Sequence, residues 1–193
     1  MRKTVLISDY VWKDLKIEKA ILARVDTGVL VSTTGTEDDL TNLAPEANGI
    51  LTCWKPVTAR VIQAAPHCVA IGRFGIGLDN IDVAEATRQG IVVTNVPSYC
   101  VEEVSDHALA LLLSLARRVT FFDRAIKSGV YDLQAGTPLF RVRGKILGIV
   151  GFGKIGRVLY HKARALGLKV IVFDPYVDRA SLGGFDVELV DFP

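Results

Sequence analysis

The sequence predicts an α/β protein with two parallel sheets, and two observations lead to that prediction. Short β-branched or aliphatic runs alternate with stretches of helical periodicity along the whole chain. In the second half, a glycine-rich turn at 151–156 separates one such run from the helical stretch that follows it. Because parallel strands are joined by helical crossovers, this alternation is typical of sheets with helices on both faces.

The strand candidates are short runs rich in Val, Ile and Leu, and the helix candidates repeat apolar residues every three or four positions. Strands are expected at 5–8, 29–32, 50–53, 69–72, 91–94, 146–150, 170–173 and, with the weakest pattern, 187–190. Helices are expected at 13–24, 37–43, 58–64, 83–89, 101–127 and 155–166. Asp82, with Glu85 three residues later, has the pattern of a capping box for the helix at 83–89.

The helix at 101–127 interrupts the alternation and is expected to join two lobes. Its middle, ALALLL, is apolar on every side, which predicts a helix buried on several sides. Pro97, in the preceding NVPS, fixes a backbone angle and removes a donor, so a hinge is expected there. The predicted domains are residues 1–97 and 98–193, and residues 129–138 are predicted to form a loop.

Composition argues against several classes of partner. The chain has 193 residues, half of them hydrophobic, and 23 Lys plus Arg against 21 Asp plus Glu. This near balance gives no electrostatic reason to expect nucleic acid or an anionic membrane, so a small-molecule ligand is favoured. The longest apolar run, 108–113, is far below the about 20 residues that span a bilayer.

Three further observations concern location and metal binding. The N-terminal apolar run before Ser8 is too short for a signal peptide, which predicts a soluble, cytoplasmic protein. The cysteines, Cys53, Cys68 and Cys100, are odd in number and lack the spacing of zinc or redox sites. They are interpreted as reduced structural thiols rather than reactive ones, and no metal site is expected.

The glycine-rich turn has the spacing of a dinucleotide-binding fingerprint. Gly151, Gly153 and Gly156 form G-x-G-x-x-G directly after the strand at 146–150 and open the helix at 155–166. The first glycine permits a tight turn, the second lets a pyrophosphate approach the backbone, and the third lets helix and strand pack closely. The amides at the start of the helix then favour phosphate.

An acidic residue stands where such a site needs one. Asp174 ends the next strand, 18 residues after Gly156, at the position from which a carboxylate accepts hydrogen bonds from the ribose hydroxyls. The same carboxylate would repel a 2′-phosphate, which favours NAD over NADP, although Arg179 nearby weakens that preference. Alternatively, Asp174 is a turn residue before Pro175.

A second glycine turn follows the strand at 69–72. Gly75 and Gly77 leave backbone amides uncovered, which suits a small anion such as a carboxylate. The alternative is that the turn is purely structural. Arg73 stands close enough to be a candidate for touching the same anion.

Three stretches together resemble one known family. GRFGIGLDNIDVAEATRQGIVVTNVP (72–97), the helix VEEVSDHALALLL (101–113) and the cradle GFGKIGR (151–157) are similar to the D-isomer-specific 2-hydroxyacid dehydrogenases, in their order and spacing. The segment FDPY (173–176) most resembles the branch of this family that contains the C-terminal-binding-protein corepressors. The resemblance implies a flavodoxin-like substrate-binding lobe followed by an incomplete Rossmann NAD-binding domain.

The resemblance also implies site residues. By position, Ile76 and Gly77 match main chain that meets the substrate carboxylate, Val104 matches a residue near the nicotinamide, Lys154 and Ile155 match pyrophosphate contacts, and Asp174 matches the ribose ligand. Glu102 and Glu103 are interpreted as complementing the helix dipole rather than as catalytic.

The family's chemistry needs an Arg, an acidic residue and a His that nothing in residues 1–193 matches, so no catalytic residue is assigned. His67, His107 and His161 are expected to be structural or solvated, and Arg117 and Arg118 to lie at a helix end or in solvent. We therefore expect a fragment, a naturally shortened product, or one piece of an assembly completed by another copy.

The predicted function is that of an NAD-dependent oxidoreductase homologue acting on the CH–OH group of a 2-hydroxy acid, with this chain inactive alone. A small 2-hydroxy or 2-oxo acid and a homodimer formed through the helix at 101–127 are the expected partners, without nucleic acid or membrane. The alternative is an NAD(H)-responsive, corepressor-like regulatory protein, and a third possibility is a degraded gene product.

Overall fold

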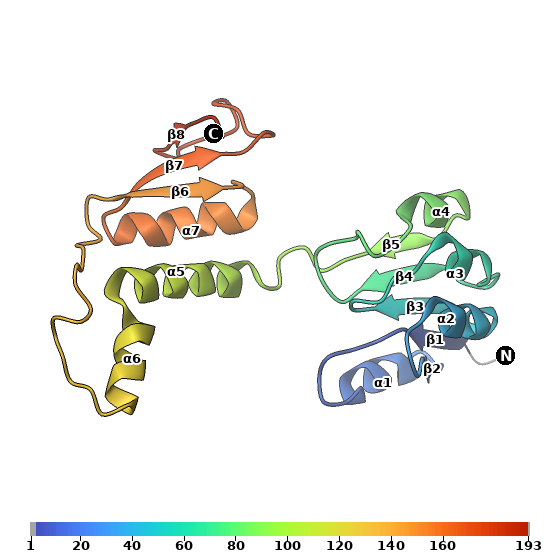
Figure 1. Ribbon diagram of the computed structural model, residues 1–193. Coiled ribbons are helices and arrows are strands. Elements are labelled where there is room, and N and C mark those ends of the chain that lie inside the picture. The colour runs from blue at the N-terminus through green and yellow to red at the C-terminus, as the bar shows by residue number, and fades with distance from the viewer. Residues whose placement is uncertain (1–2, 193) are drawn as a thin grey trace. The chain divides into compact units, whose positions relative to one another are not determined.

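A computed structural model describes residues 3–192 of the chain (Figure 1). Contacts between residues divide the chain into two compact units, Met1–Tyr99 and Cys100–Pro193. We call them the N-terminal unit and the C-terminal unit. Each contains one parallel sheet with helices connecting its strands, as the alternating sequence pattern predicts.

The sheet of the N-terminal unit has five parallel strands in the order β2-β1-β3-β4-β5. They are β1 (Lys3–Ile7), β2 (Thr27–Val31), β3 (Gly49–Thr52), β4 (Ala70–Arg73) and β5 (Val92–Thr94). Register follows from matched apolar pairs, such as Val5 opposite Val29 and Ile50 opposite Ile71. This strand order is that of flavodoxin-like folds.

Four α-helices and one short 3-10 helix connect these strands. They are α1 (Lys16–Ala23), α2 (Glu37–Leu43), η1 (Ala44–Glu46), α3 (Ala59–Gln63) and α4 (Val83–Arg88). Helix α3 contacts both α2 and α4. The fully buried Leu40, Ile62 and Ala86 of these helices form the core with strand residues Ile50 and Ile71. Helix α1, by contrast, buries none of its residues.

The predicted capping box at the start of α4 is only half formed. Asp82 accepts a hydrogen bond from the Glu85 amide at 2.9 Å, as predicted. The return bond is absent, because the Asp82 amide donates to Val57 and the Glu85 carboxylate pairs with Arg88 and Gln89 instead. A guanidinium on the next turn is a stronger partner for a buried carboxylate than a backbone amide.

The C-terminal unit has three parallel strands in the order β6-β7-β8, covered on one face by helices (Figure 1). The strands are β6 (Ile146–Val150), β7 (Lys169–Phe173) and β8 (Glu188–Leu189), and the helices are α5 (Val101–Arg117), α6 (Val119–Lys127) and α7 (Lys154–Ala165). Helices α5 and α7 pack against each other. Phe152, Ala163 and Val172 are fully buried at the centre of this core.

The prediction of one helix over 101–127 is wrong. Arg118 has a left-handed backbone, with φ +51° and ψ +37°, and its amide bonds back to Leu115 and Ser114. A left-handed residue ends a helix, so α6 leaves α5 in a new direction (Figure 1). No glycine, asparagine or proline stands at this position to indicate the break.

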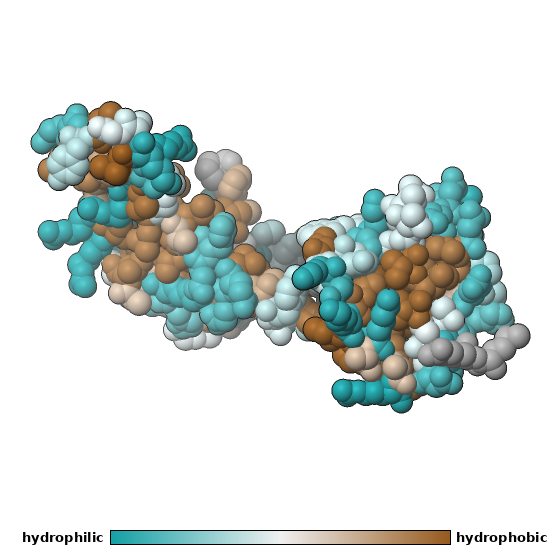
Figure 2. All heavy atoms as spheres, turned by 90° about the horizontal axis from the view of Figure 1, so that it is seen from below, coloured by the Kyte–Doolittle hydropathy of each residue, from teal (hydrophilic) through white to brown (hydrophobic). Residues whose placement is uncertain are grey.

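The expectation that this helix is buried on several sides is also wrong. Ser105 is the only buried residue among those of α5, and Leu111 and Leu115 are 54% and 80% exposed. Helix α7 covers one side of α5 and leaves the rest open. Apolar residues reach the surface on the face that Figure 2 shows, where they appear brown.

The far face of the C-terminal sheet is open as well. Ile149 of β6 faces the helices and is 6% exposed, whereas Ile146 and Val150, on the opposite face, are 64% and 70% exposed. Among the residues described, no helix has the length and apolarity that crossing a membrane requires.

Candidate functional site

The glycine fingerprint forms a tight turn between β6 and α7. Gly151 has φ +90°, a conformation that side chains disfavour, and its amide bonds to the Phe173 carbonyl at 2.8 Å. A Cβ on Gly156 would stand 2.4 Å from the Gly151 carbonyl oxygen, so helix and turn approach each other as closely as glycine allows. These two glycines have the geometric roles that the sequence pattern predicts.

Gly153 differs from its two neighbours because a Cβ there would meet no atom within 4 Å. Packing within the protein therefore does not require glycine at 153, although a side chain would fill the open space beside the turn. Gly153 is also the N-cap of α7 and offers no side chain to cap the first amides, those of Lys154 and Ile155. An open backbone at a helix N-terminus fits the pyrophosphate of a dinucleotide.

Asp174 lies directly at this turn. Its Oδ2 accepts a hydrogen bond from the Phe152 amide at 2.7 Å, and its Oδ1 accepts one from the Tyr176 amide at 2.9 Å. These amides, with Phe152 first, lower the pKa of Asp174, so it is ionised at neutral pH. The Tyr176 contact fits the interpretation as a turn residue, whereas the Phe152 contact fixes the carboxylate beside the fingerprint. The two roles are compatible.

The residue between the first two glycines anchors the turn. Phe152 is fully buried, with its ring 5.1 Å from that of Phe185 and 6.2 Å from that of Tyr160. The Arg157 guanidinium lies 5.2 Å from the Phe152 ring centroid, and its Nε donates to the Phe152 carbonyl at 3.1 Å. Sequence reasoning missed both roles. The only available signal was an aromatic inside the fingerprint and a cation in the first turn of its helix.

The second glycine turn is held firmly at the carboxyl end of β4. The Val96 amide donates to the Gly75 carbonyl at 2.9 Å, and the Asn95 side chain donates to the Ile76 carbonyl at 2.8 Å. A Cβ on Gly75 would stand 2.8 Å from a guanidinium nitrogen of Arg73, and one on Gly77 would stand 2.6 Å from Asp79. Both contacts are with the ends of flexible side chains, which can move, so packing does not strictly require glycine at 75 or 77; Gly77 is exposed.

Val104 is 42% exposed on α5, and Lys162 of α7 bonds to three other residues of that helix. The Lys162 ammonium donates to Ser105 Oγ and Asp106 Oδ1, each at 2.6 Å, and pairs with Glu102 at 2.9 Å. The hydrogen bonds to Asp106 and Glu102 raise the pKa of Lys162. Glu102 thus joins α5 to α7 in addition to standing in the first turn, a role that the sequence did not indicate.

The histidines and cysteines show no sign of a catalytic or metal-binding role. His161 packs on the Tyr160 and Phe185 rings, and His67 and His107 are exposed. Burial raises the pKa of the Cys53 and Cys68 thiols, which keeps them protonated, as expected of structural cysteines. No group of three His, Cys, Asp or Glu side chains suited to a metal ion occurs within residues 3–192.

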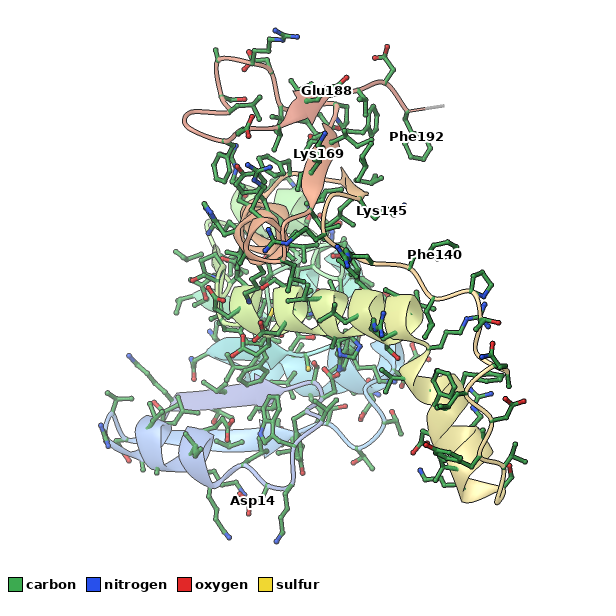
Figure 3. All side chains as sticks on the ribbon, turned by 90° about the vertical axis from the view of Figure 1, so that its left-hand side faces the viewer. Asp14, Phe140, Lys145, Lys169, Glu188 and Phe192 are labelled. Carbon is green, nitrogen blue, oxygen red and sulfur yellow. The ribbon has the colours of Figure 1, made fainter. Side chains whose placement is uncertain are left out.

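An apolar cavity of about 430 Å³ lies in the C-terminal unit at the amino end of β6. Its lining includes Leu112, Leu168, Phe140 and Lys145. The Lys145 ammonium lies 5.8 Å from the Phe140 ring centroid, and Figure 3 labels both residues. The glycine turn follows the opposite, carboxyl end of the same strand, so the cavity is separate from the fingerprint.

Comparison with known proteins identifies relatives that match most of the chain. Residues 5–182 match the family described as D-isomer specific 2-hydroxyacid dehydrogenase, catalytic domain. D-3-phosphoglycerate dehydrogenase of Synechocystis sp. is 36% identical over 191 residues, which are 97% of this chain and 33% of that protein. Glyoxylate reductase of Korarchaeum cryptofilum is 40% identical over 123 residues, 62% of this chain and 37% of that protein. The chain thus spans about a third of the length of these curated relatives.

Solved structures share the fold. D-lactate dehydrogenase from Aquifex aeolicus, complexed with NAD and lactic acid, superimposes with a TM-score of 0.82 at 22% identity. The match covers 97% of this chain and 56% of that one. The predicted fold class, a flavodoxin-like lobe followed by an incomplete doubly wound sheet, is confirmed.

Proposed function

This chain belongs to the D-isomer-specific 2-hydroxyacid dehydrogenase family, and from that premise we propose that it supplies the substrate-binding lobe and the first half of the NAD-binding domain of an oxidoreductase. The reaction is the interconversion of a 2-hydroxy acid and a 2-oxo acid, in which C2 gives up a hydride and its hydroxyl gives up a proton. NAD, when bound, accepts the hydride at its nicotinamide ring.

The observation that carries the proposal is the open glycine turn with an ionised carboxylate at its edge. The main chain of Gly151 and Gly153, with the amides of Lys154 and Ile155, holds the pyrophosphate, and the tight packing at Gly156 sets the helix close enough to do so. The Asp174 carboxylate keeps lone pairs beyond those used by the Phe152 and Tyr176 amides, and these accept the ribose hydroxyls.

On the substrate side, the proposal assigns the acid's carboxylate to the main chain of Ile76 and Gly77. The turn's rigid attachment to Asn95 and Val96 supports this role, since a pre-formed anion site loses little entropy on binding. By the same resemblance, Val104 lies near the nicotinamide. No residue of the chain is assigned to proton transfer, and we propose that residues 1–193 do not turn over substrate alone.

Calorimetry with the 193-residue chain tests the cofactor assignment. We expect NAD⁺ to bind more tightly than NADP⁺, because the Asp174 carboxylate repels a 2′-phosphate. Asp174→Asn removes that charge, so it should weaken NAD⁺ binding by about ten-fold or more. It should also reduce the difference in affinity between NAD⁺ and NADP⁺. Equal affinities for the two dinucleotides in the unmutated chain would contradict the assignment. Reduction of glyoxylate or pyruvate by NADH at ordinary rates would contradict the proposed lack of turnover.

A second candidate function is NAD(H)-responsive association into a homodimer through residues 101–127. Large apolar side chains are exposed on α5 and α6, namely Leu111, Leu115, Val119, Phe121 and Ile126. Such a surface is typical of one that meets another subunit. Light scattering with and without NADH tests it: Leu115→Glu should shift a dimer toward monomer, and a chain that is monomeric under both conditions would remove this candidate.

The proposed location is the cytoplasm, where NAD(H) is supplied and thiols stay reduced. Cys53 and Cys68 are buried as free thiols, which fits a reducing compartment.

A further inference from the structure

The N-terminal sheet reverses its direction of growth between β1 and β3. β2 lies on one side of β1, and β3, β4 and β5 follow on the other side. In open α/β sheets, ligands bind outside the carboxyl ends of the strands at such a switch point. The loops that leave β1 and β3 are therefore the favoured ligand position within this unit. The glycine turn after β4 lies next to them, because β3 pairs with β4.

Each of these three loops carries aromatic side chains. Tyr10 and Trp12 follow β1, Trp54 follows β3 and Phe74 follows β4. Trp12 packs edge-on against Phe74 with ring centroids 4.8 Å apart, and Tyr10 lies 5.9 Å from Trp12. Trp54 is 65% exposed, although indole rings favour burial. We call these four side chains the aromatic wall; Phe74 directly precedes the turn at Gly75.

The loop that bears Trp54 is fixed by Asp9. The carboxylate of Asp9 accepts hydrogen bonds from the amides of Trp54 at 2.7 Å and Cys53 at 2.9 Å, with a longer contact of 3.3 Å from that of Lys55. Burial alone would raise the pKa of Asp9, but the Ser8 hydroxyl and these amides outweigh it, and the pKa is lowered. Three amides that could hold a phosphate are thus already occupied by a negative charge.

Arg73 lies between the turn and the aromatic wall. Its guanidinium is 5.5 Å from the Trp54 ring centroid, packs on Gly75 and donates from Nε to Asn80 at 3.0 Å. A guanidinium in this position supports an acid's carboxylate at the turn. The amides beside Trp54 are used by Asp9 and are therefore not available to a second anionic group.

One buried donor in the wall has no partner. Trp12 Nε1 is inaccessible to solvent and meets no acceptor among the residues described. Buried donors are almost always satisfied by protein, water or ligand, so Trp12 Nε1 stands out as an unpaired polar atom of this wall.

We propose that this site binds a 2-hydroxy or 2-oxo acid whose substituent at C2 ends in an aromatic or bulky aliphatic group, and that Trp54 determines this specificity. The inference rests on the proposed function and names its substrate class. By this proposal the chain does not prefer phosphorylated acids, unlike the relative in Synechocystis, which is named for 3-phosphoglycerate.

Calorimetry on the 193-residue chain, with and without NAD⁺, tests the proposal with D-3-phenyllactate, D-lactate and D-3-phosphoglycerate. We expect phenyllactate to bind about ten-fold or more tightly than the other two. Trp54→Ala should remove that advantage, and Trp54→Phe should restore much of it. Tyr131→Ala, an exposed aromatic outside the N-terminal unit, is the matched control and should change nothing.

A second readout guards against a variant that fails to fold. The chain has two tryptophans, Trp12 and Trp54, and both belong to the wall. In the unmutated chain, phenyllactate should shift the NMR signals of both indole N–H groups. The signal that is missing in Trp12→Phe belongs to Trp12, and the other belongs to Trp54.

Tighter binding of 3-phosphoglycerate, an unchanged preference in folded Trp54→Ala, unshifted indole signals or no binding of any acid would overturn the proposal. NAD⁺ binding measured in the same samples reports on the proposed function separately. Normal NAD⁺ affinity without the phenyllactate preference would overturn only the substrate class.

Discussion

Two glycines of the fingerprint should respond differently to the same added methyl group. In Gly156→Ala, the new Cβ would stand 2.4 Å from the Gly151 carbonyl oxygen, a backbone atom that moves only if the turn moves. Such overpacking costs up to about 3 kcal/mol, offset by up to about 1 kcal/mol because alanine favours the helix. We expect the C-terminal unit to lose about 2 kcal/mol of unfolding free energy.

In Gly153→Ala, by contrast, the Cβ meets no atom within 4 Å, and the backbone at φ −74° and ψ −158° suits alanine. Alanine is a poorer N-cap than glycine but lowers the entropy of the unfolded chain, so these opposing effects should change the unfolding free energy by less than about 1 kcal/mol. NAD⁺ affinity should nevertheless fall about 10- to 100-fold, because the methyl group would occupy the space through which the pyrophosphate reaches the main chain. Gly148→Ala, where the Cβ would make an ordinary 3.8 Å contact with Ile171, is the control for both effects.

Urea unfolding followed by circular dichroism gives the stabilities, and calorimetry with NAD⁺ gives the affinities. The decisive variant is Gly153→Ala. If it keeps the stability and the NAD⁺ affinity of the unmutated chain, the pyrophosphate does not lie on this turn and the reasoning fails.

Two further predictions concern stability. Asp39 has its pKa lowered to about 2, first by the Ser32 hydroxyl and then by the Thr34 amide, so the unfolded chain binds its proton more readily. The stability that ionised Asp39 contributes is therefore complete above its ordinary pKa of 3.8 and disappears as the pH falls toward 2. Urea midpoints of unfolding, measured between these two pH values, should fall less steeply with acid in Asp39→Asn than in the unmutated chain. Phe152→Ala should destabilise the C-terminal unit by about 3–5 kcal/mol, because it empties a fully buried ring site. Amide exchange should show that loss in residues around β6 and α7 and leave the N-terminal core unchanged, and equal loss in both units would contradict it.

Local pattern was sufficient where the physics is local. The strand at 146–150 and the glycine turn after it were predicted because an aliphatic run and three spaced glycines each restrict the backbone by themselves. Asp174 lies 18 residues after Gly156, which is the length of the helix and strand that follow the turn, so its carboxylate is expected near the turn. The bond between Asp174 and the Phe152 amide then gives that expectation a geometry.

The sequence by itself determined the succession of strands and helices along the chain, the glycine fingerprint and the family. Tertiary structure alone decided that Arg118 breaks the long helix and that Asp9 holds the loop of Trp54. The physical reason is that a helix period or a glycine spacing acts between near neighbours. The bond from Asp9 to Trp54 instead depends on which strands lie side by side, and that order arises only when the whole sheet assembles.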